Sequence, residues 1–201
     1  MKIDPQNYWN PVIFKNNARI NIKNVVTTIN DLKFNEQKIL VCGRRESSHP
    51  DFFPKFSTPT TNVESTLYVT VDHDPHYIEY ITRKGNYALS LIVDPIVAKK
   101  ILDIGGKIFW FSHEFLDDDL PKILCGKSLK SNSGLAAISL ASYFGAKSIL
   151  LSGITLSEKI YHQFHEGKKI VFENINTRRT KIFSLDGVLA KQLKFDDWCS
   201  M

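Results

Sequence analysis

The stretch SNSGLAAISLASYFGAKSILLSG, from Ser131 to Gly153, decides the fold. Its residues from Leu135 to Phe144 are apolar on nearly every side, which predicts a helix that is buried all round. Asn132 or Ser133 can cap the start of this helix, because a short polar side chain accepts a hydrogen bond from the first free backbone N–H groups. Gly145 stands where a C-terminal cap belongs.

The residues that follow this helix, Lys147 to Gly153, form an apolar run that predicts a central strand. Similar runs alternate with helical patterns along the rest of the chain. Strands that are apolar throughout are buried on both faces, which is typical of a parallel sheet. The sequence therefore predicts an α/β fold with an open, mainly parallel sheet and helices on both faces. We expect strands near 38–43, 66–71, 88–93, 107–111 and 169–172, and helices near 19–33, 76–84, 95–103 and 186–194.

The length of 201 residues fits one domain, at 38–201, preceded by an N-terminal extension and helix at 1–37 that packs on it. No run is apolar for long enough to cross a bilayer, and the first residues carry no apolar signal core, so we expect a cytoplasmic protein. The three cysteines are widely spaced and predict neither disulfides nor a zinc site. The net charge of +5 favours an anionic partner such as a nucleotide or a nucleic acid.

A ligand site is expected where the strands of the sheet end, because open parallel sheets bind ligands outside the carboxyl ends of their strands. Gly43, Gly153 and Thr155 follow two of these strands. The turn Ser131-Asn132-Ser133-Gly134 begins the buried helix, and the free N–H groups of a helix start attract phosphate. The alternative for this turn is plain helix capping.

Two further groups of residues predict chemistry. Asp72 and Asp74 directly follow a strand, and paired carboxylates there suit a phosphate-bound Mg²⁺. The alternative is a polar turn in which the Asp74-Pro75 step starts a helix. His162 and His165 are three residues apart, so a helix would place them on one face, where either could act as a base or bind phosphate. Surface histidines are the alternative. The motifs GxSxG, GxxxxGK[ST] and GxGxxG are absent from the sequence.

From Gly126 to Leu156 the chain resembles the 6-hydroxymethylpterin diphosphokinase-like proteins, and the resemblance extends more weakly over residues 38–195. That group includes archaeal pterin diphosphokinases, bacterial motility-accessory glycosyltransferases and phage proteins, and related sialyltransferases share the pattern around Ser133-Gly134. The resemblance implies a Rossmann-like fold. The chain departs from the pattern at Arg44-Arg45, where relatives carry a Gly-Pro-Ser turn, and at Thr155, where they often carry an acidic residue.

Three functions follow as hypotheses. The first is a diphosphokinase that moves a diphosphate from ATP to a hydroxymethyl acceptor, with Asp72 and Asp74 holding Mg²⁺ and Asp72 at the reaction centre. The second is a glycosyltransferase that uses a nucleotide sugar and a small-molecule acceptor without needing a metal, with His162 or His165 as the base. The third is a non-catalytic module that binds nucleotide or nucleic acid through arginines at 44–45 and 178–179.

Overall fold

All described strands of this protein's sheet are parallel. The first strand in the sequence lies inside the sheet, and later strands are added first on one side of it and then on the other. The computed structural model describes residues 10–43, 54–61, 63–113, 115–123, 132–154, 180–184 and 191–192. Within these residues eight strands pair in the order β5-β4-β3-β2-β1-β6-β7-β8, and every pair is parallel. The strands are β1 (Lys38–Cys42), β2 (Lys55–Ser57), β3 (Leu67–Thr70), β4 (Asn86–Ser90), β5 (Lys107–Phe111), β6 (Ser148–Ser152), β7 (Lys181–Ser184) and β8 (Lys191–Gln192).

This order explains where a ligand site belongs. Strands β2 to β5 are added one after another on one side of β1, and β6 then pairs on the other side of β1. The strand order therefore reverses between β1 and β6. In open α/β sheets the loops on the two sides of such a reversal leave the sheet in opposite directions and open a crevice between them.

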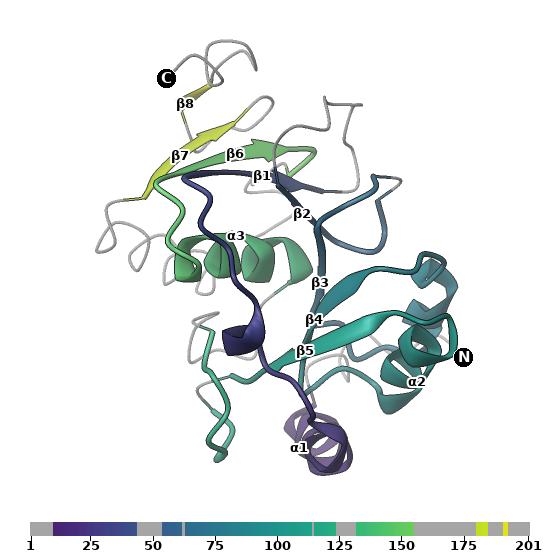
Figure 1. The fold of residues 1–201 in the computed structure, drawn as a ribbon. Coiled ribbons are helices and arrows are strands. Elements are labelled where there is room, and N and C mark those ends of the chain that lie inside the picture. Colours follow the sequence, from purple (N-terminus) through teal and green to yellow (C-terminus); the bar gives the residue numbers. More distant parts are fainter. Residues whose placement is uncertain are drawn as a thin grey trace.

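Helices cover both faces of the sheet, as the apolar strands predicted. Helix α3 (Ser133–Tyr143) packs against β1, β2, β3 and β6 on one face (Figure 1). Helices α1 (Pro11–Asn21) and α2 (Pro95–Asp103) belong to a second core on the other face, together with alternate residues of β3, β4 and β5. The 3₁₀ helices are η1 (Ile22–Asn24), η2 (Ile29–Asp31) and η3 (Pro75–Tyr80). The predicted α/β, Rossmann-like fold is confirmed.

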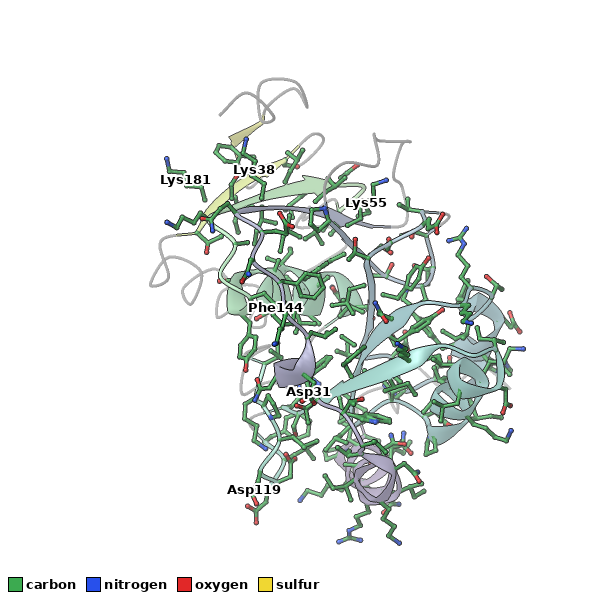
Figure 2. The ribbon with its side chains drawn as sticks, in the orientation of Figure 1. Asp31, Lys38, Lys55, Asp119, Phe144 and Lys181 are labelled. Carbon is green, nitrogen blue, oxygen red and sulfur yellow. The ribbon has the colours of Figure 1, made fainter. Side chains whose placement is uncertain are left out.

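Successive side chains of a strand point to opposite faces of the sheet, so a single strand contributes to both cores. In β3, Leu67 and Val69 join the core under α3, whereas Tyr68 points to the opposite core and stacks on Tyr87 of β4. Phe144, at the end of α3, meets Phe34 and Phe56 and closes the α3 core (Figure 2). At about 25 cal/mol per Å² of apolar surface, these two cores are the main stabilising contribution to the fold.

Helix α1 joins the rest of the protein through two buried asparagines. The Nδ2 of Asn17 donates to the carbonyl of Ile92, and the Nδ2 of Asn21 donates to the carbonyls of Leu91 and Val93. These three carbonyls belong to the turn that follows β4. The helix thereby satisfies backbone groups that burial would otherwise leave without a partner.

Several expected elements differ from the structure. The helix predicted at 19–33 is wrong: Asn10 caps a helix that starts at Pro11, and only short 3₁₀ turns occur within 22–33. Strand β2 lies at Lys55–Ser57, where no element was expected, and Lys191–Gln192 is a strand where a helical tail was expected. The strand predicted at 169–172 lies outside the described residues. None of the helices in the described ranges is long and apolar enough to cross a membrane.

Candidate functional site

The start of helix α3 lies at the carboxyl ends of the strands, where the sequence placed the ligand site. The side chain of Asn132 caps the helix, and its Oδ1 accepts from the backbone N–H of Leu135 at 2.9 Å. A Cβ added to Gly134 would come within 3.7 Å of Ile154, which follows β6. The first turn of α3 therefore lies against the segment that leaves β6, at the reversal point.

The hydroxyl of Ser133 attaches the same turn to strand β3. The Oγ of Ser133 accepts from the backbone N–H of Val71 at 3.2 Å and lies 3.2 Å from the Oγ1 of Thr70. Thr70 is the last residue of β3. The structure shows that this serine fixes the position of the helix start relative to the sheet, and its contact with phosphate stays a prediction.

Tyr77 completes a cluster of three hydroxyl groups at this place. Its side chain is only 6% exposed, and the side chains of Thr70 and Ser133 lie close enough to act on its hydroxyl and lower its pKa. Burial raises the pKa of Tyr77 well above its ordinary value, and the nearby charge of Asp72 acts in the same direction. The tyrosine therefore stays neutral, and Asp72 lies close enough to the cluster to affect it. Sequence reasoning did not single out Tyr77, because a tyrosine in a short helix has many other uses.

Gly43 and Gly153 meet where β1 and β6 end. The backbone N–H of Gly43 donates to the carbonyl of Ser152 at 2.7 Å, and a Cβ at position 43 would lie 2.4 Å from the carbonyl oxygen of Gly153. Gly153 has a φ of +65°, which favours glycine. Close packing thus explains the glycine at position 43, and the positive φ explains the glycine at position 153. Contact of either with phosphate stays a prediction.

The carboxylates of Asp72 and Asp74 take part in the turn after β3. One oxygen of Asp72 accepts from the backbone N–H of Asp74 at 3.1 Å, and one oxygen of Asp74 accepts from the N–H of His76 at 2.9 Å. Asp74 is therefore the N-cap of η3, as the turn alternative predicted. Among the described residues no group of three or more histidines, cysteines or acidic residues gathers in metal-binding geometry. The Mg²⁺ site stays a prediction that rests on these two carboxylates.

Other predicted residues have no described position. Ser131, Thr155, His162 and His165 lie outside the described residues, as do the arginines at 44–45 and 178–179. The structure brings together the remaining predicted residues of the site: Asn132, Ser133 and Gly134 at the helix start, Gly43 and Gly153 at the reversal point, and Asp72 beside the hydroxyl cluster.

A buried histidine follows the edge strand β5. His113 follows β5 and is 2% exposed, with its ring stacked on Phe115. Burial lowers its pKa to about 4, and the neighbouring Asp118 opposes this shift only in part. His113 is thus a neutral core residue near pH 7, rather than a group that faces the crevice.

Comparisons with known proteins give little beyond the fold. No family model matches the chain, and no curated protein matches it. Solved structures that match include the sialyltransferase CstII from Campylobacter jejuni with cytidine-5'-monophosphate, at 14% identity and a TM-score of 0.42, over 74% of this chain and 79% of that chain. An α-2,3-sialyltransferase from Campylobacter jejuni in apo form matches at 17% identity and a TM-score of 0.36, over 77% of each chain. Such low identities and scores extend the likeness no further than the general α/β arrangement.

Proposed function

We propose that this protein is a nucleotide-sugar-dependent glycosyltransferase that binds its donor at the start of α3. The observation that supports this most is the position of the turn Asn132-Ser133-Gly134, which lies between the end of β3 and the segment after β6. Helix starts at strand ends bind phosphate through free N–H groups and the positive end of the helix dipole. A nucleotide sugar presents such a phosphate next to the bond that breaks.

In the proposed reaction the bond between the anomeric carbon and the phosphate oxygen of the donor breaks. An acceptor hydroxyl forms the new bond to that carbon and gives its proton to a base, for which His162 or His165 is the candidate from the sequence. The negative charge of the leaving nucleotide phosphate is stabilised by the start of α3. The hydroxyl cluster of Thr70, Tyr77 and Ser133 holds this helix start in place while the charge develops.

The turn after β3 is the reason to prefer this reaction to diphosphate transfer. The diphosphokinase hypothesis requires Asp72 and Asp74 to direct their oxygens at a metal, whereas one oxygen of each accepts a backbone N–H within the turn. Transfer from a nucleotide sugar makes no such demand on these carboxylates. The two reactions differ in metal requirement and in nucleotide, so binding measurements separate them.

The first test is thermal unfolding of the purified protein with CMP, UDP, GDP and ATP, each with EDTA and with Mg²⁺. A ligand at about 100 times its Kd stabilises the native state by about 2.7 kcal/mol and raises the Tm. The proposal predicts a shift with CMP, UDP or GDP that persists in EDTA. A shift only with ATP and Mg²⁺ would favour the diphosphokinase instead, and no shift with any nucleotide would contradict both enzymes.

A matched pair of variants locates the site. Asn132→Ala removes the cap of α3, and Asn10→Ala removes the equivalent cap of α1, where Val12 N–H donates to Asn10 at the same 2.9 Å. Each change costs about 1 kcal/mol of stability. Only Asn132→Ala is expected to weaken nucleotide binding by calorimetry. Equal affinities in the two variants would show that the start of α3 is not the nucleotide site.

A further inference from the structure

A groove of about 790 Å³ runs along helix α2, distinct from the residues of the proposed donor site. Its first wall is one stripe of α2, because Pro95, Ala98, Lys99 and Leu102 follow the i, i+3, i+4, i+7 spacing of one helix face. Its second wall is the segment 23–27 that follows α1, and β5 forms its floor. The nine residues of α2 make the groove about 14 Å long, which matches two to three turns of a helix.

The rims of the groove expose apolar side chains to water. Val26 is 90% exposed and Leu102 is 57% exposed, and they stand on opposite walls. Covering such side chains is favourable by about 25 cal/mol per Å². Apolar side chains exposed beside lysines, as in this groove, are typical of a site that another molecule covers.

The charge of the groove is of one sign. Lys23, Lys99 and Lys107 line it, and no acidic residue is among its described lining residues. Lys99 pairs with Asp103 at 2.6 Å, but both side chains are more than half exposed, and such surface pairs contribute at most about 1 kcal/mol. Lys99 can therefore exchange this partner for another carboxylate, so the groove is complementary to an acidic ligand.

The backbone contacts at the floor of the groove determine whether the acidic ligand binds as a strand or as a helix. Strand β5 is an edge of the sheet, but the chain itself covers part of this edge: Trp110 N–H donates to the carbonyl of Thr27 at 3.0 Å, and the Thr27 hydroxyl donates to the carbonyl of Ile108. Addition of a peptide strand here would break these bonds. A ligand that contacts the side chains of the groove, and does not pair with the backbone of β5, leaves these hydrogen bonds intact. An amphipathic helix binds a groove in this way.

We propose that this groove is the docking site for an acidic amphipathic helix of a partner protein. The apolar face of the helix covers Val26 and Leu102, and its flanking carboxylates meet Lys23, Lys99 and Lys107. A flat bilayer would touch only the rims and leave the floor uncovered. The proposal does not depend on the glycosyltransferase function, because the groove shares no residue with the start of α3.

The test uses fluorescein-labelled helical peptides of about 16 residues, long enough for the groove. One carries leucines at i, i+4, i+7 and i+11 with glutamates between them, and a second has lysine in place of every glutamate. Fluorescence anisotropy with the full chain is expected to show binding of the glutamate peptide alone. Absence of binding up to about 1 mM, or equal binding of the lysine peptide, would overturn the proposal.

Two matched pairs of variants assign the binding to the groove. Val26→Asp is expected to weaken binding at least about tenfold, whereas Val12→Asp changes an exposed valine of α1 that does not line the groove and is expected to have no effect. Lys107→Glu is compared in the same way with Lys100→Glu, which lies outside the groove. All four side chains are exposed, so the variants keep the fold. Equal losses within a pair would overturn the site.

Two other occupants are tested alongside. Sedimentation with vesicles of phosphatidylcholine and phosphatidylglycerol examines a lipid surface, and light scattering after size exclusion examines a second copy of this chain. Vesicle binding that Val26→Asp abolishes, with no peptide binding, would replace the partner helix by a membrane. A dimer that Val26→Asp separates would replace it by self-association. A monomer that ignores vesicles and binds the glutamate peptide supports the proposal.

Discussion

Gly43 and Gly153 approach so closely that a Cβ on Gly43 would lie 2.4 Å from the carbonyl oxygen of Gly153. The contact joins the ends of β1 and β6, where the strand order reverses. No side chain can occupy that position unless the backbone moves, since real Cβ atoms do not come so near to an oxygen. The relative position of the ends of β1 and β6 is therefore fixed by backbone packing.

We predict that Gly43→Ala destabilises the protein by about 3 kcal/mol, the upper part of the usual range for overpacking. Gly145→Ala is the control, because its Cβ meets nothing within 4 Å and only its φ of +84° opposes the change. That conformational cost is about 1 to 2 kcal/mol. Urea unfolding of both variants measures the difference, and a smaller loss for Gly43→Ala than for Gly145→Ala would contradict the packing argument.

A second prediction concerns the bond between Ser133 and β3. Ser133→Ala leaves the N–H of Val71 without its acceptor, and a polar group left unsatisfied in this way costs about 1 to 3 kcal/mol. Tyr77→Phe removes a hydroxyl from the same cluster and leaves that N–H bonded, so it is expected to cost less. Urea unfolding gives both values. If Tyr77→Phe proved the more harmful, the tyrosine rather than the serine would attach α3 to the sheet.

The same variants separate positioning from ligand contact. If Ser133 acts only by holding the helix start, Ser133→Ala and Tyr77→Phe weaken nucleotide binding in proportion to their losses of stability. If Ser133 also contacts phosphate, its variant loses more affinity than stability. Calorimetric titration with the nucleotide that raises the Tm most compares the two.

A third prediction is a loss of stability in acid that is due to His113. Its pKa is about 4 in the folded protein, below the ordinary 6.5. Between these values the unfolded chain binds a proton that the folded chain does not, so stability falls as the pH falls from about 6.5 to about 4. The loss attributable to this residue is about 3 kcal/mol when it is complete, and it is absent above pH 7.

His113→Phe is the variant that tests this dependence. Among the described residues the Nε2 of His113 has no hydrogen-bond partner, so replacing the ring by phenylalanine leaves no group unsatisfied there. The difference in unfolding free energy between wild type and variant, measured by urea titration at pH 4.5, 5.5, 6.5 and 7.5, is expected to change by about 1.4 kcal/mol per pH unit below 6.5. A constant difference across this range would show that His113 is not buried in the neutral form.

The parts of the fold that the sequence predicted are those whose signals are local. Asp94 caps α2 and Pro95 begins it, and Asn132 caps α3, because each boundary carries a short polar or cyclic residue that does not depend on tertiary contacts. Strand β5 was placed at Lys107–Phe111 in full agreement with the structure, since Gly106 and a dense apolar run mark its start.

The elements that were missed depend on distant partners. Strand β2 has only three residues and includes a lysine, and it is a strand because β1 and β3 pair with it on either side. The apolar spacing from Ile22 to Leu32 suggested one long helix, but Val25 adopts an extended conformation and Trp110 of β5 pairs with Thr28. Thr28 and Trp110 are 82 residues apart (110 − 28). A pairing over that distance produces no periodic pattern in the local sequence.

The residues of the candidate site also divide into those with a local sequence signal and those whose roles depend on distant partners. Glycines, caps and carboxylates at strand ends could be found from the sequence, because fold rules say where strand ends meet. The roles of Thr70 and Tyr77 could not, since they arise only when β3, η3 and α3 come together in space. Nor could the sequence show that close packing, apart from any ligand, requires a glycine at position 43.

A fourth prediction uses Asp72 to decide between the two transferases. Asp72→Asn keeps an oxygen that can accept from the N–H of Asp74, so the turn after β3 and the fold are expected to be unchanged. The substitution removes the negative charge that a metal would need. Under the glycosyltransferase proposal, the affinity for nucleotide in EDTA therefore stays within about twofold of wild type, a change of less than about 0.5 kcal/mol.

Asp74→Asn tests the second proposed metal ligand, and it keeps the cap of η3 by the same argument. If Mg²⁺ strengthens ATP binding to the wild type and both substitutions abolish that effect, the carboxylates hold a metal and the diphosphokinase hypothesis replaces the glycosyltransferase. If neither substitution changes nucleotide affinity and Mg²⁺ has no effect, the two carboxylates hold no metal, and stabilisation of the leaving phosphate by the start of α3 remains the proposal.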